Sequence, residues 1–60
     1  MRGQLLGYDT ARGEGVISAE DGTRYRFRQE EWRAPAGGVQ PGTIVDFNID
    51  ENGGASEIYP

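Results

Sequence analysis

Cysteine, histidine and lysine are all absent from this 60-residue sequence, and each absence excludes a class of chemistry. Without cysteine the chain forms no disulfide and offers no thiolate to a metal. Without histidine, no side chain titrates near neutral pH unless its environment perturbs it strongly. Ser18 and Ser56 also have no histidine or lysine that would activate them as nucleophiles. We therefore expect no enzyme, no metal site and no cofactor.

Long apolar segments are missing as well. The first residues, MRGQLLGYD, contain one two-leucine run, which excludes a secretory signal, and no stretch is long enough to span a membrane. These features favour a cytoplasmic protein. The chain is expected to form one small domain, residues 1–60, with a core of marginal size, because a chain this short buries only about 60% of its unfolded surface.

Glycine is abundant, with ten residues, and helix-favouring runs are scarce, so strands joined by turns are expected. In TIVDFNI, Val45, Phe47 and Ile49 alternate with polar residues, the period of a strand with one buried face. The strand candidates are residues 3–8, 14–19, 23–28, 43–49 and 55–59. The segment RAPAGGVQPG, residues 33–42, is rich in proline and glycine and is expected to be a mobile loop. Successive strands without a helix predict an all-β fold, a small antiparallel barrel.

The central hairpin, RGEGVISAEDGTRYRFR, turns at EDG. Ile17 and Tyr25 have to face the core, because the arginines on either side of Tyr25 belong at the surface. A two-residue turn at Asp21 and Gly22 would set Ile17 opposite Arg26, a core residue against a surface residue. A three-residue loop sets Ile17 opposite Tyr25 and puts Gly22 at the left-handed position that such a loop requires. We therefore predict the three-residue loop.

This register determines what the hairpin presents on its outer face. It places Val16 opposite Arg26 and Glu14 opposite Arg28, and Arg24 completes a row of three arginines at alternate positions. The row is either an electropositive stripe for a polyanion or a solvated strand face balanced by neighbouring acids, and the sequence leaves both interpretations open.

The net charge of −4 argues against strong nonspecific binding of phosphates. The charge is uneven, however. Residues 1–28 hold five arginines against four acidic residues, whereas residues 29–60 hold one arginine against six. The acidity therefore belongs to the C-terminal half, and the half with the central hairpin carries a small positive excess.

Several stretches together resemble the cold-shock domain family. RGEGVIS is similar to that family's first ribonucleoprotein motif, K-G-F-G-F-I, and EDG to the acidic turn that follows it. RYRFR stands where the family has V-F-V-H-F, QPGTIVDFNI resembles E-G-x-x-V-x-F, and GGASEIY resembles the closing strand. The match covers nearly the whole chain. It implies a five-stranded oligonucleotide-binding barrel (OB fold) that binds single-stranded RNA or DNA.

In that family, unpaired bases stack on aromatic side chains of the first three strands. Position by position, Arg12 keeps the charge of the motif's lysine, while Glu14 and Val16 replace aromatics. Arg26 and Arg28 stand for an aromatic and a histidine. The resemblance thus places charged side chains on most of the platform.

On the first strand Gly7 occupies the family's tryptophan position, and Tyr8 takes the place of a phenylalanine. Together with the replacements above, this leaves Tyr8 as the only aromatic ring of the platform. Stacking is worth about 1–3 kcal/mol per base, so the loss of several rings predicts weak binding. Arginine recovers a part of it by stacking on bases and pairing with phosphates. The residues expected to contact nucleic acid are Tyr8, Arg12, Glu14, Val16, Arg26 and Arg28.

The remaining aromatic residues are expected to be structural. Tyr25 and Phe27 should face the core, Trp32 should cover one end of the barrel, and Tyr59 should pair within the sheet.

Two functions from different classes remain. The first is weak, largely sequence-independent binding of single-stranded nucleic acid through the hairpin. The second is an accessory module that keeps the barrel without binding nucleic acid and docks a protein partner. Under the second hypothesis the domain is the soluble N-terminal part of a larger membrane-associated protein, and Pro60 as the last residue is compatible with a domain cut from a longer chain.

Overall fold

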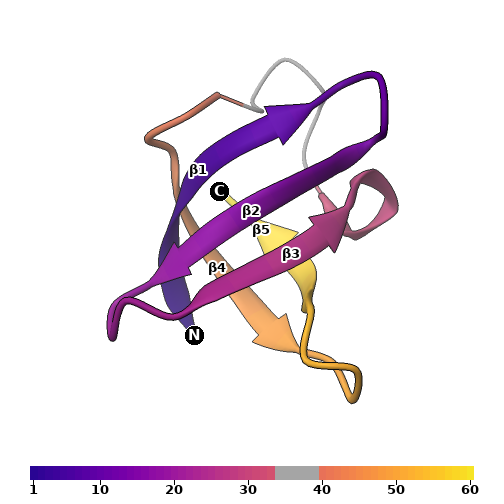
Figure 1. Cartoon of the computed structure of the whole chain (residues 1–60). Helices are drawn as coiled ribbons and strands as arrows, with labels where there is room; N and C mark the ends of the chain where they lie inside the picture. The colour runs from indigo at the N-terminus through magenta and orange to yellow at the C-terminus, as the bar shows by residue number, and fades with distance from the viewer. Residues whose placement is uncertain (34–39) are drawn as a thin grey trace.

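The computed structural model describes residues 1–33 and 40–60, over which the chain is all-β (Figure 1). The elements are β1 Arg2–Asp9, β2 Glu14–Ala19, β3 Arg24–Arg28, the 3-10 helix η1 Gln29–Glu31, β4 Ile44–Ile49 and β5 Ala55–Tyr59. All five predicted strands are confirmed, with boundaries within one residue of the prediction. Residues 34–39 of the predicted mobile loop lie outside the described residues. No helix in the described ranges is long and apolar enough to cross a membrane.

The strands form one sheet in the order β3-β2-β1-β4-β5, and every neighbouring pair is antiparallel. The sheet curves strongly, so that β4 and β5 lie behind the β2–β3 hairpin (Figure 1). One hydrophobic cluster fills the space between the two layers: Leu5, Ile17, Ala19, Phe27, Trp32, Val45, Phe47, Ala55 and Ile58. The predicted burial of Phe27 and Trp32 is confirmed, and Tyr25 packs against the cluster.

The predicted all-β fold with five antiparallel strands is confirmed, but the sheet does not close into a barrel over the described residues. β3 and β5 are the two edges of the sheet and share no ladder over the described residues. Within those residues the gap between them, termed the seam, is bridged by an isolated parallel pairing of Trp32 with Ile58. There the Arg33 N–H donates to the Ile58 carbonyl at 2.8 Å. The five-stranded antiparallel sheet is therefore open along the seam.

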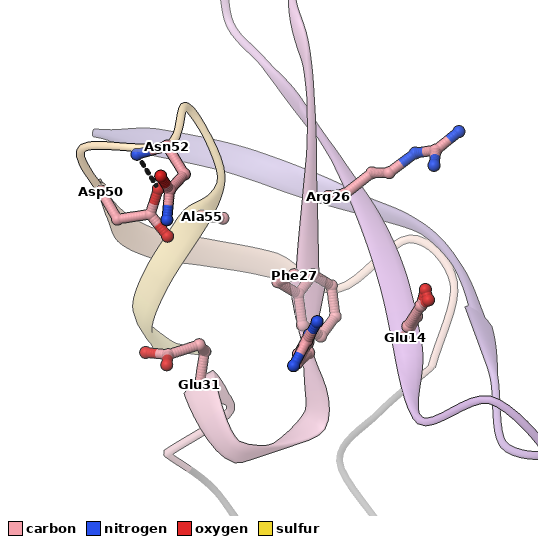
Figure 2. Close-up of a pocket in the computed structure, with 8 residues that line it drawn as sticks. Glu14, Arg26, Phe27, Glu31, Asp50, Asn52 and Ala55 are labelled. Carbon is pink, nitrogen blue, oxygen red and sulfur yellow. Dashed lines mark hydrogen bonds between the residues drawn. The ribbon is translucent and has the colours of Figure 1, made fainter.

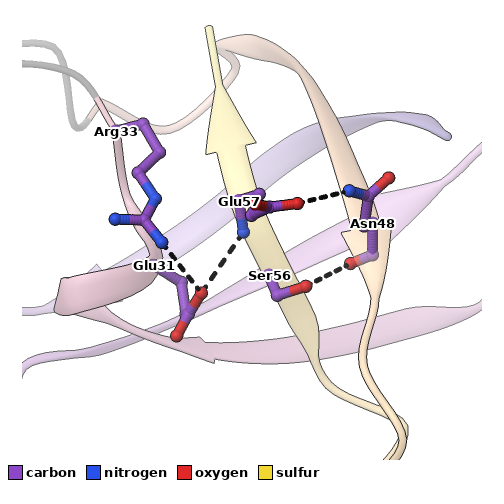
Figure 3. A network of polar contacts seen from close by, with 5 residues as sticks. All are labelled: Glu31, Arg33, Asn48, Ser56 and Glu57. Atoms are coloured by element: carbon purple, nitrogen blue, oxygen red, sulfur yellow. Dashed lines mark hydrogen bonds and ion pairs between the residues drawn. The ribbon is translucent and has the colours of Figure 1, made fainter.

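β5, which forms one side of the seam, is irregular in its pairing with β4. Its pairing with β4 shifts register between Asp46 and Asn48, and Glu57 adopts a φ of 48°, in the left-handed region. The Glu57 N–H donates to Glu31 Oε1 at 3.3 Å, and the Glu57 carboxylate accepts from Asn48 Nδ2 at 2.7 Å (Figure 3). A bulge of this kind disrupts the ladder locally, so β5 presents no regular edge to β3.

The predicted three-residue loop of the central hairpin is confirmed. The Ala19 N–H donates to the Thr23 carbonyl at 2.8 Å, and Gly22 has a φ of 87°, the left-handed conformation expected there. The strand pairs that follow from this loop are Ile17–Tyr25, Val16–Arg26 and Glu14–Arg28. The outer face of the hairpin therefore carries the side chains that the sequence placed on it.

Asp21 stabilises this loop through its carboxylate. Its Oδ1 accepts a hydrogen bond from the Thr23 backbone N–H at 2.9 Å. Hydrogen bonds from the Thr23 backbone, and then from its side chain, favour the ionised form and hold the pKa of Asp21 below its ordinary value. The loop is therefore tightest when Asp21 is ionised.

Asp21→Asn should lower the Tm slightly at about pH 7, and the difference from wild type should shrink as the pH falls. A carboxylate with a lowered pKa stabilises the fold above its unfolded pKa of about 3.9, and this contribution is lost as the pH falls through the folded-state value. The Tm difference should thus be constant above about pH 5 and smaller at about pH 3. Thermal unfolding followed by circular dichroism measures it, and a difference independent of pH would refute this role of Asp21.

Candidate nucleic-acid interface

The outer face of β1, β2 and β3 carries three rows of side chains, set by the strand registers. Residues directly opposite each other in neighbouring strands lie on the same side of a sheet, so each row crosses all three strands. The rows are Asp9–Glu14–Arg28, Gly7–Val16–Arg26 and Gln4–Ser18–Arg24. This surface, termed the hairpin face, holds four of the six predicted contact residues: Glu14, Val16, Arg26 and Arg28.

The six arginines of the chain are all exposed, but their surroundings divide them into two groups. Three pair with a carboxylate: Arg2 with Asp46 at 3.4 Å, Arg12 with Asp9 at 3.9 Å, and Arg33 with Glu31 at 3.8 Å. Arg24, Arg26 and Arg28 form no ion pair with any residue in 1–33 or 40–60. β3 therefore presents a row of three cations, none of which forms an ion pair with a described carboxylate.

Arg12 lies in the loop between β1 and β2, beside the hairpin face. Asp9 shapes this loop, since its Oδ1 accepts from the N–H groups of Ala11 at 3.0 Å and Arg12 at 3.3 Å. The Arg12 side chain is 78% exposed although its Nε lies 3.9 Å from Asp9 Oδ2. Arg12 is therefore accessible to a ligand, but Asp9 neutralises a part of its charge.

Glu14 lies at the centre of the hairpin face and is half-buried. Its Cα partners are Arg28 on β3 and Asp9 on β1. Glu14 and Arg28 form no ion pair in the described residues, although the register sets them opposite each other. A phosphate bound at the arginine row would nonetheless meet the repulsion of this carboxylate, which limits the affinity of the face for polyanions.

Tyr8 lies on the opposite side of the sheet from the arginine row. It pairs with Gly15, whose added Cβ would lie 2.4 Å from Phe27 Cζ, so both residues face inward. The Tyr8 ring stacks on Phe27 with centroids 6.1 Å apart, and its hydroxyl donates to Gln29 Oε1 at 3.0 Å. Tyr8 is therefore a half-buried rim residue with one ring face on Phe27, and not an outward-facing platform ring.

A β-bulge causes this placement. The register of β1 on β2 shifts between Leu5 and Gly7, which leaves Leu6 as an extra, exposed residue. Uninterrupted alternation from the buried Leu5 would have turned Gly7 inward and Tyr8 outward. The bulge reverses the faces of all residues after it, so Gly7 and Asp9 reach the hairpin face.

Three shallow depressions meet at Glu14 and together include all six predicted contact residues. The largest, about 510 Å³, spans the seam and includes Asp50, Asn52 and Glu31 (Figure 2). These three residues are not among the contact residues predicted from the sequence. The curvature of the sheet brings the β4–β5 turn beside β3, and η1 follows β3 directly in the chain. The second depression has a volume of about 410 Å³ and is lined by residues that include Tyr8 and Arg12. The third has a volume of about 310 Å³ and lies at the β1–β2 loop.

No protein-family model, curated protein or solved structure matches this chain. The resemblance to the cold-shock domain therefore stays a prediction that rests on the sequence motifs. The functional assignment rests on the geometry and charge of the hairpin face.

Proposed function

We propose that this domain is a degenerate cold-shock-like OB fold that binds single-stranded RNA or DNA weakly and largely independently of sequence through the hairpin face. The strand order supports the fold assignment, because β1 pairs with both β2 and β4. The open seam supports it too, since the OB fold is a five-stranded barrel that is only partly closed.

The observation that carries the proposal is the arginine row of β3, which forms no ion pair with a described carboxylate. Arg24, Arg26 and Arg28 occupy alternate positions, so their side chains lie on one face at intervals of about 6.7 Å. A guanidinium is always charged, binds phosphate through paired N–H groups and stacks on bases. A row of such groups on an exposed strand suits an extended polyanion, whose phosphates supply most of the affinity in nucleic-acid binding.

The proposed affinity is weak because the face lacks rings. Val16 and Glu14 occupy the centre, and Tyr8 is turned inward against Phe27. Each missing ring forgoes about 1–3 kcal/mol of base stacking. Phosphate contacts remain, and they carry no direct sequence information, so the binding is largely independent of sequence.

One observation favours the second function, an accessory protein-interaction module. One row of the hairpin face, Asp9–Glu14–Arg28, sets two carboxylates beside an arginine and is therefore of mixed charge. A folded partner with complementary charges suits such a row better than a polyanion does. Indifference to oligonucleotides would favour this function.

The dependence of affinity on salt tests the proposal. Each phosphate contact on a single strand contributes about −0.7 to the slope of log K against log salt concentration, so three arginine contacts predict a slope of about −2. Fluorescence anisotropy with a labelled mixed-sequence 12-mer, from about 20 to 200 mM salt, measures the slope. An absence of binding at the lowest salt, or a slope near zero, would reject the proposal.

A further inference from the structure

The open seam forms a groove beside the arginine row (Figure 2). Its volume of about 510 Å³ lies in the range of sites that take small ligands. The lining residues of this seam groove are Glu14, Arg26, Phe27, Arg28, Glu31, Asp50, Asn52 and Ala55. The buried Phe27 and Ala55 supply apolar surface, while the polar residues supply groups that a ligand would contact.

The two walls of the seam groove differ in chemistry. β3 contributes Arg26 and Arg28, which have no ion pair with a described residue. The β4–β5 turn contributes Asp50 and Asn52, and η1 contributes Glu31. The arginine wall therefore donates hydrogen bonds beside the single carboxylate of Glu14, and the other wall mainly accepts them.

The backbone holds the accepting wall in position. Asp50 Oδ1 accepts from the N–H groups of Asn52 at 2.9 Å and Gly54 at 2.8 Å. Glu31 Oε1 accepts from the Glu57 N–H at 3.3 Å. The second oxygen of each carboxylate, and the Asn52 carboxamide, have no hydrogen-bond partner among residues 1–33 and 40–60. The two carboxylates are therefore held in place with one oxygen each available to a ligand, and the Asn52 carboxamide is available beside them.

We propose that the seam groove selects nucleotides whose base carries an exocyclic amino group, namely cytosine, adenine and guanine, over thymine and uracil. This inference rests on the proposed function: a phosphate lies on Arg26 or Arg28, and the edge of its base reaches Asp50, Asn52 or Glu31. A carboxylate accepts from the N4 amino group of cytosine, and asparagine pairs with adenine. Thymine and uracil carry a carbonyl oxygen where cytosine has its amino group, and their single N3–H at this edge lies between two carbonyl oxygens that repel a carboxylate.

Cytosine and thymine oligonucleotides of equal length give the cleanest test. Cytosine and thymine are both pyrimidines. At position 4 cytosine carries an amino group and thymine a carbonyl oxygen. Competition measured by fluorescence anisotropy at about 20 mM salt should show the cytosine 12-mer binding about fivefold more tightly, the lower end of what a good side chain–base contact gives.

The Asp50→Asn variant tests whether the seam groove is responsible for base selection. The Asn Oδ1 still accepts the two backbone hydrogen bonds of the turn, while an amino group replaces the free carboxylate oxygen. The cytosine-to-thymine ratio should fall to about one. Glu51→Gln removes the same charge from the same turn outside the groove, so it should raise both affinities and keep the ratio. Glu31→Gln should also reduce the ratio and tests the groove independently of the β4–β5 turn.

The outcomes separate this inference from the function on which it rests. If the wild-type domain binds neither oligonucleotide at low salt, the proposed function itself fails. If it binds both with a ratio near one, or if both Asp50→Asn and Glu31→Gln keep the wild-type ratio, base selection by the seam groove is refuted and the proposed function stands.

Discussion

Replacing Gly3 by alanine should lower the free energy of unfolding by about 3 kcal/mol, the upper part of the usual range for overpacking a core. Gly3 pairs with Ala19 on β2 and with Val45 on β4, at the centre of the sheet. An added Cβ would lie 2.6 Å from the Ser18 carbonyl oxygen and 2.8 Å from Ile17 Cγ2. Because the Ser18 oxygen belongs to the backbone of a paired strand, the clash is relieved only by separating β1 from β2.

Gly7→Ala is the matched control, since Gly7 lies on the same strand and an added Cβ would meet nothing within 4 Å. It should be neutral or stabilise the domain slightly, because alanine restricts the unfolded chain. Urea unfolding followed by the fluorescence of the buried Trp32 measures both variants. A domain of 60 residues has about 3–9 kcal/mol of stability in total. If the wild-type value lies at the lower limit, the Gly3→Ala variant should be about half unfolded without urea. Equal stability of the two variants would contradict the packing described for Gly3.

The double variant Arg26→Gln/Arg28→Gln should weaken binding of single-stranded DNA about 30-fold at low salt. Each lost arginine–phosphate contact is worth about 1 kcal/mol, the upper end for an exposed ion pair, and two such contacts correspond to about 30-fold in Kd. The two residues lie on the hairpin face without an ion pair to a described residue. Fluorescence anisotropy at about 20 mM salt measures the change.

Arg2→Gln/Arg33→Gln is the charge-matched control, because it also removes two cations but takes them from ion pairs with Asp46 and Glu31. Its affinity should stay within about threefold of wild type, since only long-range charge is changed. Both variants should elute at the wild-type volume in size-exclusion chromatography, a necessary check because charged residues on an edge strand oppose edge-to-edge pairing. An equal loss in both variants would mean that overall charge, and not the arginine row, determines binding.

Much of the fold followed from local patterns in the sequence. Tyr25 and Phe27 alternate with arginines, and pairing the core residue Ile17 with Tyr25 allowed one register only, because a shift by one residue would have set Ile17 opposite Arg26. Gly22 then marked the left-handed position of the loop. These signals are strong because burial and backbone conformation restrict the same few residues.

The placement of Tyr8 did not follow from the sequence. The bulge at Leu6 reverses the facing of every later residue in β1, and a bulge at an exposed leucine has no local sequence signature. The irregularity of β5 was equally hidden, because Glu57 adopts a backbone conformation that glycine or asparagine would normally indicate. The open seam and the groove across it were hidden as well, so Asp50, Asn52 and Glu31 were not identified as candidate site residues.

An amide chemical-shift titration of the labelled domain with a single-stranded 12-mer tests the central claim most directly. Shifts should be confined to the hairpin face, above all Glu14, Val16 and residues 24–28, and to the adjoining seam groove. They should shrink between about 20 and 150 mM salt. The outer face of β4, which includes Ile44 and Asp46, should be unaffected. An absence of shifts at low salt, or shifts concentrated on β4 and independent of salt, would contradict the claim that the arginine row of β3 binds nucleic acid.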